Sequence, residues 1–208
     1  MNRYKNMLPL ISGIIFMFTG FVAVATAWIA GLYRFDLRLS FSSYVGLRHS
    51  TSVMYLVSAL IILTMMAYYM AKTKMLTIKK IVYSGVFICI LGTALFPYTV
   101  YAGGDKNSII SSIHYVFSIC LMIPGTISFI LSAVLSKNKK QRTAAVLSLT
   151  YAAVFLVLFV SKFAPLYNTF FIWENVCVLL LLFGAYMERY GEEDTVSEEQ
   201  KPLIYAAN

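Results

Sequence analysis

The sequence has few charged residues and none of the short motifs that identify common enzymes. Charged side chains make up 12% of its 208 residues, whereas soluble globular domains carry about 25%. There is no GxSxG elbow, Walker loop, GxGxxG or HExxH. The composition argues against a soluble domain, and no motif assigns an activity.

Cysteine is also scarce. The chain has three cysteines, at Cys89, Cys120 and Cys177, with no CxxC pair among them. All three stand inside apolar stretches, so they give no sign of an extracellular disulfide framework. Free cysteine is commonly buried as a small apolar side chain, and we predict this role for all three.

Long apolar runs are what the sequence has in abundance. Hydrophobic residues make up 60% of the chain, and a membrane-spanning helix needs about 20 mostly apolar residues to cross a hydrocarbon core of about 30 Å. We predict an all-α bundle of six transmembrane helices in residues 1–190, followed by an acidic, disordered tail in residues 191–208. The predicted spans are Leu8–Tyr33, Ser50–Ala71, Ile81–Tyr101, Ile109–Ser136, Ala144–Phe163 and Tyr167–Met187.

The positive residues between the runs predict the orientation. Loops with an excess of Lys and Arg stay in the cytoplasm, so both termini are predicted to be cytoplasmic. Because the charges form short clusters between spans, the net charge of +8 does not indicate a nucleic-acid partner. The ten cytoplasmic charges would be Arg3, Lys5, Lys72, Lys74, Lys79, Lys80, Lys137, Lys139, Lys140 and Arg142, and the five outside would be Arg34, Arg38, Arg48, Lys106 and Lys162.

The first run resembles a secretory signal peptide. Arg3 and Lys5 precede an apolar stretch, and Ala25-Thr26-Ala27 would suit a cleavage site. The apolar stretch exceeds the usual length of about 7–15 residues and continues to Tyr33. We therefore expect a retained helix, with cleavage as the alternative.

Small residues recur at every fourth position in the first and fifth runs. Close backbone approach holds helices together in lipid, because hydrophobicity does not separate helix from lipid. Each series therefore predicts a face that contacts another helix. The two series are Ala23, Ala27, Gly31 and Ala144, Ser148, Ala152.

The ionisable residues of the spans gather at one predicted depth. Such residues are costly in a membrane and suggest a functional site. Under the predicted topology, they all lie toward the extracytoplasmic side, although neighbouring helices run in opposite directions. We predict a cavity there with Arg48, His49, His114 and Glu174 as its polar floor and Tyr98 and Trp173 as its rim.

Three interpretations of this cluster remain open. It could be a structural polar clamp, a site for a lipid headgroup or small amphiphile, or a catalytic or metal site. In a catalytic site, His114 would be a general base with Glu174 as its partner. We favour a non-enzymatic integral membrane protein, without metal or cofactor, in which Arg48 holds a phosphate or carboxylate. The alternatives are a lipid-modifying enzyme and a transporter or complex subunit with a protein partner in the membrane.

Short motifs resemble those of a known family. The stretch Ser42-Ser43-Tyr44-Val45-Gly46, the stretch Gly92–Pro97 and the following His114 resemble a bacterial family of six-helix membrane proteins of unknown function, the DUF 998 type. The layout is also similar to that of DRAM/Sfk-like membrane proteins. Tyr44 departs from the pattern, which has an acidic residue beside the serines. The resemblance implies a six-helix bundle with no established chemistry. For the eukaryotic DRAM/Sfk-like relatives, it implies a role in membrane lipid organisation or vesicular trafficking rather than catalysis.

Overall fold

The computed structural model describes residues 7–31, 44–98, 108–163 and 169–188. These residues form six helices and no strand, so the prediction of an all-α protein with six helices is confirmed. The predicted tail lies outside the described residues. The helices are α2 (Leu8–Ile29), α4 (His49–Lys72), α5 (Thr77–Leu95), α6 (Ile109–Leu135), α7 (Lys139–Val160) and α9 (Phe170–Met187).

Five of these helices have the length and apolar composition of membrane spans. They are α2, α4, α5, α6 and α7, as expected of a multi-pass membrane protein. Helix α9 is the shortest of the six, with 18 residues. The apolar segment of α9, Ile172–Met187, is shorter than each of the other five helices.

Several helix ends differ from the ends of the apolar runs. Helix α2 stops at Ile29 because Gly31 takes a positive φ of 65°, which is usual just after a helix. Helix α5 stops at Leu95, shortly before Pro97, because the residues before a proline disfavour helix. Helix α7 begins early, at Lys139, because the Asn138 side chain accepts hydrogen bonds from two backbone amides of its first turn.

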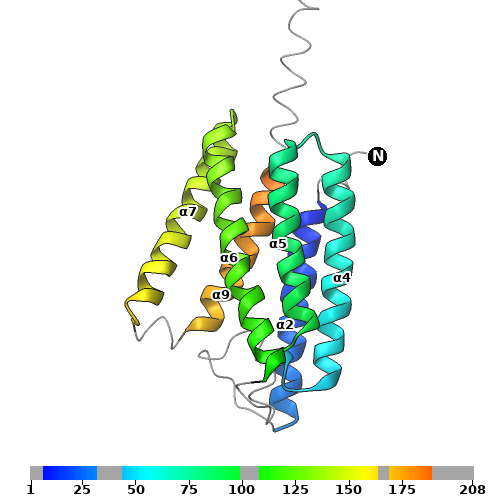
Figure 1. The fold of residues 1–208 in the computed structure, drawn as a ribbon. Coiled ribbons are helices and arrows are strands. Elements are labelled where there is room, and N and C mark those ends of the chain that lie inside the picture. Colours follow the sequence, from blue (N-terminus) through cyan, green and yellow to red (C-terminus); the bar gives the residue numbers. More distant parts are fainter. Residues whose placement is uncertain (1–6, 32–43, 99–107, 164–168, 189–208) are drawn as a thin grey trace, which may run out of the picture.

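The shortest helix lies among all the others. Helix α9 packs against α2, α6 and α7. The Tyr69 hydroxyl of α4 donates a hydrogen bond to the Ala185 carbonyl of α9 at 2.7 Å. Lys79 of α5 reaches Glu188, which follows the last residue of α9. Figure 1 shows α9 behind α5 and α6, with α2 and α4 on one side and α7 on the other.

The small-residue stripe of α2 is a packing face, with one correction. Ala23 and Ala27 are buried, and the Thr19 hydroxyl bonds the Ser58 hydroxyl of α4 at 2.8 Å. The prediction is wrong for Gly31, which is exposed and lies beyond the end of the helix. In the second series, Ser148 is buried.

The predicted burial of the cysteines holds for one of the three. Cys89 is buried, Cys177 is half-buried, and Cys120 is exposed on α6. The prediction is therefore wrong for Cys120. An apolar helix in a membrane protein can place cysteine on either side, because lipid and protein interior are both apolar.

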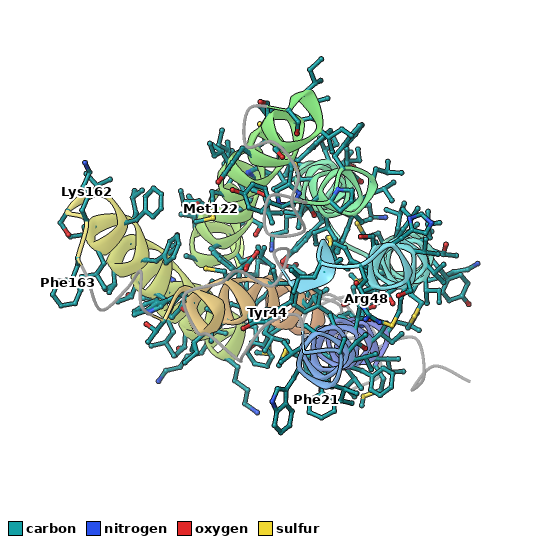
Figure 2. The ribbon with its side chains drawn as sticks, turned by 90° about the horizontal axis from the view of Figure 1, so that it is seen from below. Phe21, Tyr44, Arg48, Met122, Lys162 and Phe163 are labelled. Carbon is teal, nitrogen blue, oxygen red and sulfur yellow. The ribbon has the colours of Figure 1, made fainter. Side chains whose placement is uncertain are left out.

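Helix α7 lies at the edge of the bundle. It tilts away from α5 and α4 in Figure 1, and its last residues point outward where Lys162 and Phe163 are labelled in Figure 2. Few of its side chains are buried, and large apolar ones such as Leu147 and Val157 are mostly exposed. The apolar runs that predicted α7 and α9 are similar in length, so their length and apolar character did not show that α7 is peripheral and α9 central.

Candidate functional site

The six residues predicted as a site all lie toward one end of the bundle. Helices α4, α6 and α9 begin at the lower end of Figure 1, and α5 ends there. We call this the lower end, and the opposite side the upper end. His49, His114 and Trp173 stand within the first turns of their helices, while Tyr98 follows the end of α5. The fold therefore places these residues toward the same end, with α9 beginning higher than α4 and α6 in Figure 1.

His114 caps the end of α5. Its Nδ1 lies 2.7 Å from the Phe96 carbonyl oxygen, and because a carbonyl only accepts, Nδ1 must carry the proton. The last carbonyls of any helix lack partners within the helix, and Pro97 has no amide hydrogen to offer to the preceding turn. The buried imidazole thus supplies a donor that the α5 backbone lacks.

The glycine of the same motif lets α5 and α6 approach closely. A Cβ built on Gly92 would overlap the ring of Phe117 in α6. That ring stacks on Phe96, with 6.1 Å between ring centroids. Gly92, Phe96 and Pro97 therefore act with His114 as one packing unit that joins the lower halves of α5 and α6.

Tyr98 and Tyr115 extend this packing unit beyond the end of α5. The Tyr115 hydroxyl donates a hydrogen bond to the Tyr98 hydroxyl at 3.0 Å. The Tyr98 ring centroid lies 5.8 Å from that of His114. Tyr98 is buried, although it was predicted as part of an open rim. Of the predicted site residues, the described contacts bring together Tyr98 and His114.

Arg48 and His49 are held in an exposed position at the start of α4. The turn before them is anchored because Tyr44 and Val45 are almost fully buried. Figure 2 shows Tyr44 toward the middle of the bundle and Arg48 beside it, in the view from the lower end. The Thr51 hydroxyl fixes the turn further by donating to the Val45 carbonyl at 2.7 Å. Arg48 and His49 are thereby presented on an anchored turn and left exposed.

Trp173 packs between α9 and α7. Its ring stacks on Tyr151, with centroids 5.1 Å apart, and the Tyr151 hydroxyl donates to the Trp173 carbonyl at 3.1 Å. The indole Nε1 donates to the Thr169 hydroxyl at 3.2 Å. The described contacts therefore assign Trp173 a role in holding α7 to the bundle.

Glu174 is half-buried at the start of α9. It lies within electrostatic range of the Tyr55 hydroxyl of α4 and of the Cys177 thiol. Tyr55 in turn lies 3.2 Å from the Thr93 hydroxyl of α5. Glu174 is thus close to the polar contacts that join α4 and α5 at the lower end.

A buried ion pair between α5 and the end of α9 was not predicted. Lys79 Nζ lies 2.9 Å from both carboxylate oxygens of Glu188, and the Ser132 hydroxyl donates to Glu188 Oε1 at 2.8 Å. All three side chains are buried. This clasp joins α5, α6 and α9 at the upper end, opposite to the predicted site.

A sequence signal for the clasp existed. Lys79 had been assigned to the positively charged loops, but it lies inside α5, four residues before the buried Tyr83. Residues four apart share a helix face, and Ser128 and Ser132 of α6 repeat this spacing. Glu188 directly follows the last apolar run, on the same predicted side as the basic loops to which Lys79 had been assigned.

The described part of the chain contains no cluster of side chains placed to bind a metal ion. Within residues 7–31, 44–98, 108–163 and 169–188, no three His, Cys, Asp or Glu side chains are placed to hold one ion. The metal-site interpretation of the predicted cluster therefore gains no support from the geometry of these residues.

No family model, curated protein or solved structure matches this chain. The resemblance to the DUF 998 type thus stays a prediction. Its motif residues Gly92, Phe96, Pro97 and His114 do form a contiguous packing unit.

Proposed function

We propose that the protein is a non-enzymatic membrane protein that spans the bilayer six times, with both termini in the cytoplasm. The sixth span would be α9, whose 18 residues rise about 27 Å at 1.5 Å per residue, close to the hydrocarbon thickness. Its place among the five long apolar helices supports this role. The upper end would then face the cytoplasm.

The proposed function of the lower end is to bind the anionic headgroup of a lipid or a small amphiphile. The observation that carries this proposal is the exposed pair Arg48 and His49 on an anchored turn. A guanidinium can bind a phosphate or carboxylate through two parallel hydrogen bonds. Because the turn is fixed by buried Tyr44 and Val45, the backbone at this position needs little ordering on binding.

A binding role fits the lower end better than catalysis by His114. With Nδ1 donating to the Phe96 carbonyl, the lone pair of His114 is on Nε2, but the residue is only 3% exposed and lies beside Tyr98, so its ring is shielded from a substrate outside the bundle. A general base needs a lone pair within hydrogen-bond reach of its substrate. His114 instead serves the α5–α6 packing unit, and the exposed Arg48 and His49 are the side chains at this end that can meet a ligand.

The test is lipid analysis of the purified protein. We expect Arg48→Ala with His49→Ala to lose an anionic lipid that co-purifies with the wild type. Arg48→Lys should keep part of it, because charge remains while bidentate geometry is lost. Arg142→Ala is the matched control, since Arg142 is exposed at the upper end. Equal lipid content in all four proteins, with unchanged melting temperatures, would refute the proposal.

A further inference from the structure

An apolar groove runs along the outside of α2 beside α9. Its volume is about 510 Å³, and its lining contains no charged residue. Gly13 faces α9, since a Cβ at this position would lie 3.6 Å from Leu179 Cδ2 and 3.8 Å from Leu182 Cδ1. Below this contact, Met17, Phe18 and Phe21 continue the groove along α2 alone. Figure 2 shows Phe21 on the outer side of α2.

The side chains of this groove are open to the surroundings of the bundle. Ile14 is 68% exposed, Phe18 65% and Phe21 72%. Because α2 is one of the long apolar helices, these side chains face hydrocarbon when the protein is in a membrane. The groove therefore opens sideways toward lipid.

The length of the groove fits a single lipid chain. The stretch of α2 from Pro9 to Phe21 rises about 18 Å at 1.5 Å per residue. One leaflet contributes roughly half of a hydrocarbon core of about 30 Å. The groove thus extends over about the depth of one leaflet.

A second copy of the chain fits this surface less well. Helix–helix contact in lipid uses small residues that let two backbones approach. The small residues Ser12, Ala23 and Ala27 of α2 are buried inside the bundle. The groove walls at Met17 and Phe18 are large and exposed, and they suit a thin, flexible ligand better than a helix.

We propose that the α2–α9 groove is a binding site for one acyl chain of a membrane phospholipid. Gly13 leaves the α2 side of the groove without a side chain beside Leu179 and Leu182, and Met17, Phe18 and Phe21 contact the chain. This site goes beyond the function proposed above. It occupies the upper half of the bundle, since it involves the first half of α2 and the second half of α9, and it does not use Arg48 or His49.

The experiment uses the full chain in vesicles of phosphatidylethanolamine and phosphatidylglycerol, with a trace of phospholipid carrying a photoreactive diazirine on its acyl chain. Mass spectrometry then locates the labelled peptides. We expect labels concentrated on residues 9–21 and 179–183 rather than on the exposed faces of α6 and α7. Equal labelling of all exposed apolar faces, or cross-linked dimers joined through α2, would overturn the proposal.

Variants sharpen the test. Met17→Ala with Phe18→Ala should lower labelling of α2 about fivefold, the change produced by a loss of roughly 1 kcal/mol. Ile14→Trp should lower it as well by narrowing the groove. The matched control, Ile119→Ala with Ile123→Ala, removes exposed apolar side chains from α6 and should leave α2 labelling unchanged. Unaltered α2 labelling in both groove variants would contradict the proposal.

The two lipid proposals can be refuted independently of each other. Arg48→Ala should remove the anionic lipid of the lower end and leave diazirine labelling of α2 intact. Loss of both signals in that variant, with the melting temperature unchanged, would show that the groove is not an independent site.

Discussion

The two ends of the bundle differ in where their polar side chains lie and in what those side chains contact. At the upper end, a lysine, a glutamate and a serine from three helices are buried together in the Lys79–Glu188–Ser132 clasp. At the lower end, a buried histidine serves a backbone carbonyl while Arg48 and His49 are left exposed. The upper end therefore buries one ion pair between helices, in addition to its exposed lysines, whereas the lower end leaves Arg48 and His49 exposed on an anchored turn.

This difference shows that an ionisable side chain in an apolar interior, although costly in free energy, does not by itself identify a binding site. A charge buried in an apolar interior must be paired and hydrogen-bonded, and the clasp satisfies this need within the protein. Charges that the protein itself satisfies have little to offer a ligand. Arg48 is exposed instead, and the buried Tyr44 and Val45 fix the turn that carries it, which is why we favour the lower end for binding.

Breaking the clasp should give the largest effect. Glu188→Leu leaves Lys79 charged, buried and without its carboxylate, and we expect the free energy of unfolding to fall by about 3–5 kcal/mol. The measurement is unfolding in mixed detergent, followed by circular dichroism. Lys79→Met with Glu188→Leu should recover most of the loss, since an apolar pair can replace a buried ion pair.

The control for this prediction is Lys139→Met, because Lys139 is exposed at the same end. It should change stability by no more than about 0.5 kcal/mol. A similar loss in Lys139→Met and Glu188→Leu would show that net charge, rather than the buried pair, stabilises the upper end.

A second, smaller loss is expected from the packing unit of the lower end. Gly92→Ala places a methyl group against the Phe117 ring, and overpacking of this kind costs about 1–3 kcal/mol. Phe117→Leu should relieve part of the cost when the two changes are combined. Gly13→Ala is the matched control, since its methyl group would meet Leu179 at an ordinary contact distance of 3.6 Å. Equal effects of the two glycine changes would contradict the geometry.

The smallest effects compare one tyrosine hydroxyl from each end. Tyr69→Phe removes the buried hydrogen bond to the Ala185 carbonyl and should cost about 0.6 kcal/mol, the average for hydrogen bonds between membrane helices. Tyr115→Phe removes the donor to Tyr98, but Tyr115 is 46% exposed. We expect a smaller change there, measured by the same unfolding assay. A larger loss for Tyr115→Phe would reverse the contrast between the ends.

The candidate site was predictable in depth but not in detail. Alternating helix directions were enough to place Arg48, His114 and Glu174 toward one end. Whether a side chain points into the bundle or out of it depends on the rotation of each helix about its axis. The uniformly apolar runs carry little information on this rotation, so burial of Tyr98 and exposure of Arg48 became visible only in the fold.

The sequence by itself determined the six helices and their alternating directions, because each apolar run is long and each is bounded by charges, glycine or proline. Tertiary structure alone decided that the short α9 occupies the centre while the longer α7 lies at the edge. It also decided that Lys79 is a buried partner of Glu188 rather than a loop charge. The physical reason is that lipid and protein interior are both apolar, so hydropathy selects helices for the membrane, whereas small residues and polar contacts select their neighbours.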